Sequence, residues 1–388
     1  MDFELSEEQR AFQASVRTFA ERNLAAGALA RAHDERFPWD VARAMAEAGL
    51  FGIMLPEEDG GAGGTLMDAV LAMEQIAYVC PRSADVLQAG NFGAFRTFAE
   101  YATPEQKARF FTPLLRGETI AAVAMSEPEA GSALTDLTTA CTPDGDGFRL
   151  NGGKVFTSNT EDASVFLVYC RFGPGVSGIG SVLVERGMEG FTLGQPSRYM
   201  NGETWCALYF DNVFIAPENV LLREGGFRRQ IAGFNVERIG NTTRARALGE
   251  YCFVQAKAHA ETRRQFGRTL SEFQGIQWKF AEMRVALDAA QLLLYRAASR
   301  ADRALPSAQD VAIAKYACNQ AGWLAANEAM QVMGGTGYSQ DLLIEYCVRK
   351  TRGWMIAGGS LEMMKNRIAE GVFERSFSQR PDRSNSAR

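Results

Sequence analysis

The sequence predicts an α+β fold in which two helical regions flank a central β region. Three stretches of different periodicity along the 388 residues support this prediction. Apolar residues recur at helical spacing to about residue 120, short β-prone runs broken by Gly and Pro follow, and helical spacing returns from about residue 235. We therefore expect a helical domain at 1–120, a β domain at 121–232, a helical bundle at 233–375 and a disordered tail at 376–388.

Capping signals mark the first helical region. Ser6 and Gln9 match a capping box, and Phe12 and Val16 follow at helical spacing, which is typical of an amphipathic helix. A second start signal lies at 103–106, where Thr-Pro-Glu-Gln places proline at the first helical position. These signals predict helices at both ends of the first domain.

The central region contains the β-prone runs AAVAM, SVFLVY, GSVLV and CALYF. Asn151-Gly152 lies between two further runs and predicts a hairpin turn. Residues 173–178 match GxGxxG, but a strand-like run follows them, whereas a dinucleotide-binding loop leads from a strand into a helix. We interpret 173–178 as a loop between strands.

The third region predicts a helical bundle. Ser271 and Gln274 match a capping box, and an apolar stripe runs from Ile276 to Leu294. The segment 376–388 is polar, rich in Arg and Ser, and without periodicity, which is typical of a disordered tail.

Composition excludes several functional classes. The net charge is −5 and the basic residues are dispersed, so we expect no nucleic-acid partner. The acidic N-terminus lacks a signal-peptide pattern, no apolar run approaches roughly 18 residues, and the seven cysteines lie far apart, which together predict a cytoplasmic protein. His33 and His259 are the only histidines, which excludes a His-rich metal site. The chemistry must then depend on carboxylates or a cofactor.

Four segments, at 124–132, 150–159, 263–283 and 331–338, resemble the acyl-CoA dehydrogenase family in sequence and in order. The resemblance implies a helical domain, a middle β-barrel-like domain and a C-terminal four-helix bundle. It also implies FAD as the cofactor, an acyl-CoA substrate, an electron-transferring flavoprotein as electron partner, and a homotetramer.

The resemblance assigns cofactor contacts residue by residue. The flavin ring and pyrophosphate would be contacted from the β domain by Met125, Ser126, Ser132, Phe156 and Ser158. A neighbouring subunit's FAD would be contacted by Arg263, Phe266, Gln274, Gln331 and Gly335. Ser360 and Glu362 match positions near the nucleotide. Ala133 departs from the family, which often has Asp there, and we expect this to remove a local hydrogen bond only.

Hydrogen loss from an acyl thioester needs a carboxylate beside the α carbon and a hydride acceptor at the β carbon. Many relatives carry this base in a C-terminal motif that matches 356–362, where this chain has Gly358. A smaller set carries it on the first bundle helix, immediately before an Arg, and here Glu237 precedes Arg238. The resemblance thus implies Glu237 as the base, with Arg238 and Gly358 as substrate contacts. Without the resemblance, Glu237 would be interpreted as a surface carboxylate.

Several alternatives stay open at this point. Glu237-Arg238 with the run GGSLEM resembles the branch that contains crotonobetainyl-CoA reductase, which implies an enoyl-CoA reductase. The run at 82–84 with Gln88 resembles glutaryl-CoA dehydrogenase, so Arg82 would hold a distal carboxylate of the substrate and decarboxylation would accompany oxidation. A flavin monooxygenase on the same fold, and a flavin-binding or flavin-free member with a structural or regulatory role, are two further alternatives.

Overall fold

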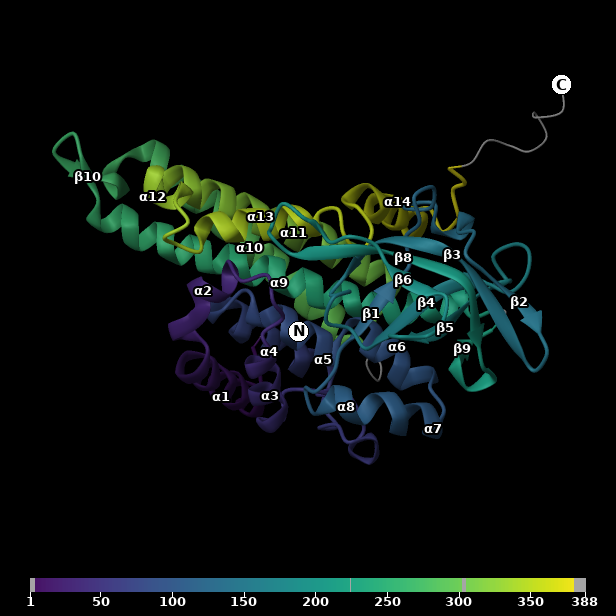
Figure 1. Cartoon of the computed structure of the whole chain (residues 1–388). Helices are drawn as coiled ribbons and strands as arrows, with labels where there is room; N and C mark the ends of the chain where they lie inside the picture. Colours follow the sequence, from purple (N-terminus) through teal and green to yellow (C-terminus); the bar gives the residue numbers. More distant parts are fainter. Residues whose placement is uncertain (1–3, 224, 302–304, 380–388) are drawn as a thin grey trace, which may run out of the picture.

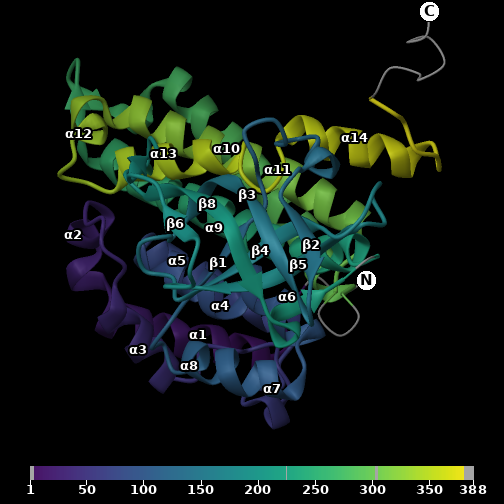
Figure 2. The same cartoon turned by 45° about the vertical axis from the view of Figure 1, so that its right-hand side comes forward.

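The computed structural model describes residues 4–223, 225–301 and 305–379. Figures 1 and 2 show three parts: the N-terminal helices in purple and blue, a teal sheet, and a bundle of long green and yellow helices that crosses the molecule. This arrangement confirms the predicted α+β fold. The tail predicted at 376–388 lies mostly outside the described residues, which end at 379.

The N-terminal region consists of short and medium helices. They are α1 (Glu7–Asn23), α2 (Ala28–Ala32), α3 (Trp39–Glu47), α4 (Leu66–Val79), α5 (Ser83–Asn91), α6 (Gly93–Tyr101), α7 (Pro104–Gln106) and α8 (Thr112–Leu115). Both predicted capping boxes are confirmed: Ser6 caps α1 through Gln9, and Thr103 caps α7 through Gln106. Helix α4 is buried along almost its whole length, so it forms the centre of this region.

The β region is a mixed nine-stranded sheet. Its strands are β1 (Ala121–Ala124), β2 (Ala140–Asp144), β3 (Gly147–Ser158), β4 (Val165–Arg171), β5 (Ile179–Glu185), β6 (Phe191–Leu193), β7 (Ser197–Arg198), β8 (Thr204–Ile215) and β9 (Val220–Leu222). The order is β6-β8-β3-β2-β4-β5-β9, while β1 pairs with β4 and β7 with β8. Strands β4 and β5 are buried at every position except the last, so they form the core of the sheet.

The hairpin predicted at Asn151-Gly152 is wrong, because both residues lie inside the continuous strand β3. The turn between β2 and β3 lies earlier, after the paired residues Asp144 and Gly147. Gly152 instead follows a register shift of β3 against β8, and a Cβ on it would lie 2.7 Å from Thr139. The glycine therefore permits a bulge inside a strand. The loop interpretation of 173–178 is confirmed, because this segment joins β4 to β5.

The C-terminal region is a helical bundle. Its helices are α9 (Phe227–Thr262), α10 (Gln274–Ser299), α11 (Ala308–Met333), α12 (Gly335–Tyr338), α13 (Ile344–Trp354) and α14 (Leu361–Val372), and the hairpin β10 (Arg264–Gln265) with β11 (Arg268–Thr269) joins α9 to α10. The predicted box at Ser271 and Gln274 is wrong. Thr269 and Glu272 form the box around a short 3₁₀ turn, and Gln274 is the first residue of α10.

Helix α9 places the candidate site. It packs against α10, α11 and α13 on its bundle side and against α4, α5 and α6 on the other. The junction of α5 with α6 therefore faces the first part of α9, which is also the part nearest the sheet in Figure 1. Within the described ranges, no helix is long and apolar enough to cross a membrane.

Candidate active site

Glu237 lies half-buried in the first part of α9. Gln88 of α5 donates its Nε2 hydrogen to Oε2 of Glu237 at 2.7 Å, and Asn241 donates its Nδ2 hydrogen to Oε1 at 3.1 Å. A Cβ built on Gly93, the first residue of α6, would lie 2.6 Å from Oε2. The carboxylate therefore lies at the junction of α5 and α6 with α9, held by two amides.

Gly358 lies beside Asn241, the residue that also donates to Glu237. A Cβ built on Gly358 would lie 3.5 Å from Nδ2 of Asn241 and 3.8 Å from Nζ of Lys315, which are ordinary contact distances. The fold thus places Glu237 and Gly358, the two positions at which members of the family carry the base, next to the amide of Asn241. In this chain only the position on α9 carries a carboxylate.

Arg238 fixes the segment that contains Gly358. Its Nε donates to the carbonyl oxygen of Gly358 at 2.8 Å, and its Nη1 donates to Oδ1 of Asn235 at 2.7 Å. Burial, with Arg367 as a second contribution, lowers the pKa of Arg238 to about 10, so the guanidinium stays charged at neutral pH. In this chain its charged group therefore supports the backbone beside Glu237.

Lys315 of α11 is part of the same neighbourhood, and the sequence analysis missed it. Its side chain is fully buried and donates to the carbonyl oxygens of Trp354 and Ala357, both at 2.9 Å. Burial lowers the pKa of Lys315 to about 7, and the nearby Arg238 acts in the same direction. A lone lysine within the apolar run AIAKYA was the signal that could have identified it.

Arg82 is placed in an internal ion cluster, formed by Arg82, Asp85, Glu203, Arg244 and Lys350. Its Nη1 lies 3.2 Å from Oδ2 of Asp85 and 3.4 Å from Oε1 of Glu203. Lys350 pairs with both carboxylates, and Arg244 pairs with Asp85. Burial alone would raise the pKa of Asp85, but the three cations, Lys350 first, lower it overall. Arg82 is therefore already engaged by two carboxylates of the chain itself.

The fold joins two of the segments that resemble the family. The backbone N–H of Val155 donates to the carbonyl oxygen of Ser126 at 2.9 Å, and Nζ of Lys154 donates to the carbonyl oxygen of Met125 at 3.1 Å. Met125 and Ser126 thereby lie beside β3, next to the position of Phe156 in the chain. These candidate flavin contacts form one group at the rim of the sheet.

Phe156 has two unusual properties. Its side chain is 60% exposed and its φ is +57°, a backbone conformation that bulky residues rarely adopt. Its ring lies 4.7 Å from that of Trp205, and the hydroxyl of Tyr199 donates to its carbonyl oxygen at 2.9 Å. Trp205 and Tyr199, which the sequence analysis did not select, therefore hold an exposed aromatic wall. Ser132 and Ser158 are also exposed.

The second group of candidate cofactor residues lies elsewhere. Its members are all exposed, and they are Arg263, Phe266, Gln274, Gln331 and Gly335. Phe266 also has a positive φ, of +51°, and is 94% exposed. Figure 1 shows β10 and α12, which neighbour these residues, at the end of the bundle that points away from the sheet. A single chain therefore does not bring this group to Phe156.

Ser360 and Glu362 lie at the N-terminus of α14, two and four residues after Gly358. The hydroxyl of Ser360 accepts a hydrogen bond from the backbone N–H of Met363 at 3.4 Å and so caps the helix. Glu362 is exposed, and hydrogen bonds from its own backbone N–H and from Ser360 lower its pKa. The carboxylate of Glu362 therefore faces solvent, whereas the hydroxyl of Ser360 is engaged in the helix cap.

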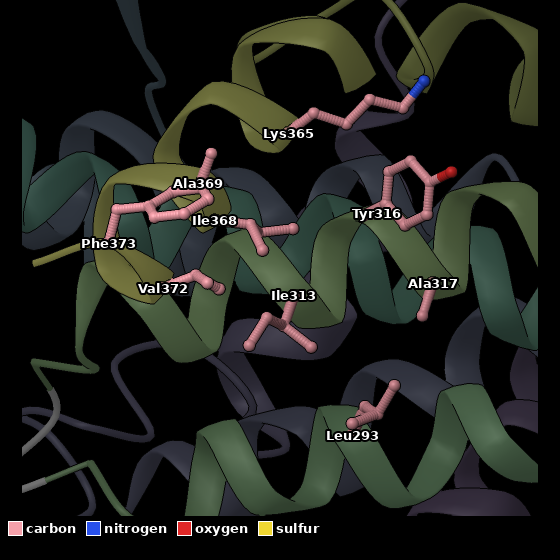
Figure 3. A pocket seen from close by; sticks show the side chains of 9 residues that line it. All are labelled: Leu293, Ile313, Tyr316, Ala317, Lys365, Ile368, Ala369, Val372 and Phe373. Carbon is pink, nitrogen blue, oxygen red and sulfur yellow. The ribbon is translucent and has the colours of Figure 1, made fainter. Parts of the chain in front are cut away.

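A separate apolar pocket lies between α10, α11 and α14. Figure 3 shows its lining, which includes Leu293, Tyr316, Ile368 and Phe373. Its volume is about 520 Å³, and Lys365 is the charged residue in its wall. Because no carboxylate lines it, this pocket does not contain a candidate base.

Comparisons with known proteins agree along most of the chain. Residues 6–118, 122–213 and 224–373 match the models of the N-terminal, middle and C-terminal domains of acyl-CoA dehydrogenase. A short-chain-specific acyl-CoA dehydrogenase of Clostridium acetobutylicum is 32% identical over 378 residues, covering 96% of this chain and 100% of the relative.

Two solved structures have the same fold. Butyryl-CoA dehydrogenase of Megasphaera elsdenii superimposes with a TM-score of 0.90 at 28% identity, covering 96% of this chain and 100% of that one. A glutaryl-CoA dehydrogenase in complex with glutaryl-CoA superimposes with a TM-score of 0.91 at 28% identity and covers 98% of each chain.

Proposed function

Because the chain belongs to the acyl-CoA dehydrogenase family, it is an FAD-dependent oxidoreductase, and we propose that Glu237 is the base of its reaction. The reaction is the removal of hydrogen across the Cα–Cβ bond of an acyl-CoA thioester. One observation carries the assignment of the base. The carboxylate of Glu237 and the missing side chain of Gly358 face the same amide, that of Asn241.

The two groups of candidate cofactor residues suit FAD. A flat ring system needs an exposed aromatic wall, and the exposed ring of Phe156 lies beside the backbone of Met125 and Ser126. A pyrophosphate needs cations, amides and small residues, and Arg263, Gln274 and Gly335 are of these kinds and exposed. Exposed Phe156 and Phe266 with positive φ also suit contacts with a ligand, since strained residues concentrate at functional sites.

Glu237 is equipped to take the α proton. An ionised carboxylate has about four acceptor positions, and the two amides use one on each oxygen, so a position on each oxygen remains for the substrate proton. When bound, FAD supplies the acceptor for the hydride that leaves the β carbon. Arg238 holds the backbone at Gly358, which keeps the segment beside Glu237 in place.

We further propose a homotetramer that transfers its electrons to an electron-transferring flavoprotein in the cytoplasm. The two groups of cofactor residues lie in different parts of the chain, so a neighbouring subunit would complete each FAD site. The seven cysteines are all buried and free, which is compatible with a reducing compartment.

The ion pairs of Arg82 argue against the decarboxylating alternative. That reaction would need Arg82 to bind a carboxylate of the substrate, but its guanidinium is bound to Asp85 and Glu203. We therefore propose oxidation without loss of a carboxyl group.

Anaerobic absorbance spectroscopy of the purified flavoprotein tests this function. Short, branched, cyclic, aromatic and dicarboxylic acyl-CoAs are added, and bleaching of the flavin band by one class is the expected result. Glu237→Gln should keep the bound flavin but slow bleaching by about 10²–10⁴-fold, the usual contribution of a general base. Glu261→Gln, an exposed carboxylate on the same helix, is the matched control and should bleach at the wild-type rate.

Other results of these experiments would indicate a different base or a different reaction. Unchanged bleaching in Glu237→Gln contradicts the assignment of the base. If no thioester bleaches the flavin, reoxidation of the reduced enzyme by an enoyl-CoA identifies a reductase, and rapid reoxidation by oxygen with an oxygenated product identifies a monooxygenase.

A further inference from the structure

We infer that Gln88 and Asn241 are positioning residues that act as an amide clamp on Glu237, and that Gly240 is the residue that makes room for this clamp. The inference rests on the proposed role of Glu237. It adds that the carboxylate is held by donors whose orientation the fold determines, so that the base is aimed before the substrate binds.

Asn241 can present only its amide nitrogen to Glu237. Its Oδ1 accepts a hydrogen bond from Nη2 of Arg244, one turn further along α9, and an arginine side chain has donors only. The Nδ2 group must therefore point the other way, where Oε1 of Glu237 lies at 3.1 Å. Arg244 is itself held by Asp85 in the ion cluster, which fixes the orientation of the amide.

Gln88 is oriented by a similar argument. Its Nε2 donates to Oε2 of Glu237 at 2.7 Å and also reaches the backbone carbonyl oxygen of Glu237 at 3.3 Å. Both partners are acceptors, so the amide nitrogen must face them. Only 7% of Gln88 is exposed, so little water reaches its amide to replace Glu237 as a partner.

Gly240 allows Gln88 to lie directly on α9. A Cβ at this position would overlap Oε1 of Gln88 and would lie 2.8 Å from its Cδ and Nε2. These distances are shorter than van der Waals contact allows, so one of the two groups must move. The group that can move is the end of the Gln88 side chain. Alanine at 240 would therefore displace Gln88 from Glu237 without changing either residue.

Gly93 also lies against the carboxylate of Glu237. Its φ is +61°, and a Cβ on it would lie 2.6 Å from Oε2 of Glu237. The start of α6 thus lies against the carboxylate where Gln88 approaches it. Two amide donors and a bare backbone together define one position for the base.

Gly240→Ala is the sharpest test, because it displaces Gln88 without changing Gln88 or Glu237 itself. If Gly240 had a purely structural role, alanine would change the stability of the enzyme but leave the bleaching rate of the folded protein at the wild-type value. The clamp predicts a folded flavoprotein that retains FAD and in which acyl-CoA bleaches the flavin about 10- to 100-fold more slowly. A larger α-deuterium isotope effect on bleaching is also expected, because proton removal becomes the slower event.

Gly371→Ala is the matched control. A Cβ at Gly371 of α14 would overlap the amide of Gln309 in the same way, but neither residue contacts Glu237.

Gln88→Met and Asn241→Asp extend the test. The first removes a donor at similar volume, and the second keeps an acceptor for Arg244 while losing the donor to Glu237. Gln75→Met, another buried glutamine on a helix, should bleach at the wild-type rate.

Combination with Glu237→Gln separates the two claims. If the clamp acts through Glu237, adding Gly240→Ala to Glu237→Gln slows bleaching by no more than about twofold further. Bleaching at the wild-type rate in Gly240→Ala, Gln88→Met and Asn241→Asp would overturn the clamp while Glu237 remained the base. Wild-type bleaching in Glu237→Gln itself would overturn the proposed function instead.

Discussion

Single residues with unusual environments surround the proposed site. Phe156 and Phe266 are exposed aromatics held at positive φ, a conformation that costs of order 1–3 kcal/mol each. Lys315 is a fully buried lysine whose Nζ donates to two backbone carbonyl oxygens. Each of these arrangements destabilises the fold locally, and each lies where the family resemblance implies cofactor or substrate.

Lys315 should give the enzyme a pH-dependent stability. Its pKa is about 7 in the folded protein and about 10.4 in an unfolded chain, so between these values the unfolded chain holds a proton that the folded chain has released. The contribution of Lys315 to stability therefore rises with pH through this window, by at most about 1.4 kcal/mol per pH unit.

Thermal melts of wild type and Lys315→Met at pH 7, 8 and 9 measure this contribution. We expect the melting temperature of wild type to rise relative to that of Lys315→Met across the series. Lys257→Met, a change at an exposed lysine on α9, should shift equally at every pH. Parallel curves for wild type and Lys315→Met would contradict the prediction.

At the scale of elements, α9 is the helix on which the site depends, and its position is set by close contact with α11. Gly249 of α9 and Gly322 of α11 meet where the helices cross, since a Cβ on Gly249 would lie 2.8 Å from the Cα of Gly322. In the opposite direction, a Cβ on Gly322 would overlap the backbone carbonyl of Ala245. Two glycines thus allow backbone-to-backbone packing between the helices that carry Glu237 and Lys315.

Gly322→Ala should lower stability by about 1–3 kcal/mol, because the new methyl group meets rigid backbone and the helices must separate. Gly353→Ala in α13 is the control, since a Cβ there meets nothing within 4 Å. Its expected effect is a gain of up to about 1 kcal/mol from helix propensity. Thermal or denaturant unfolding measures the stability of both variants and of wild type. If Gly322→Ala is as stable as wild type, the packing of α9 on α11 does not depend on this contact.

At the scale of the whole molecule, exposed apolar residues mark a surface that a second copy should cover. Trp278, Val285 and Leu292 recur every seven residues on α10 and are 60%, 71% and 49% exposed. Such a stripe along one helix face is typical of helix-to-helix association. The stripe begins near Gln274 of the second group of cofactor residues and runs along most of α10.

Val285→Arg should therefore reduce the oligomer to smaller species and lower the FAD content of the purified protein. A buried unpaired charge in a subunit contact costs several kcal/mol, enough to dissociate it. Val176→Arg places the same charge at a residue of similar character in the loop between β4 and β5, where 48% of the side chain is exposed, and should change neither property. Light scattering after size-exclusion chromatography, with the flavin-to-protein absorbance ratio, measures both.

Features that depend on residues within one or two turns of each other could be predicted from the sequence. The capping boxes at Ser6 and Thr103 and the strand runs of the sheet depend on neighbours in the chain, and the structure confirms them. The hairpin at Asn151-Gly152 failed because the same dipeptide also suits a bulge, and only pairing with β8 selects between them. The segments that resemble the family predicted FAD as the cofactor. The position of Glu237 immediately before Arg238 predicted it as the base.

The surroundings of Glu237 required the tertiary structure. Gln88 lies 149 positions from Glu237 in the chain, and only the packing of α5 on α9 makes it a donor. Asn241 is one turn away, but the direction of its amide depends on Arg244 and, through it, on Asp85 of another helix. The sequence by itself determined the fold class, the cofactor and the candidate base, because these depend on local pattern and motif. Tertiary structure decided what holds the base, because hydrogen-bond direction depends on partners that only folding brings together.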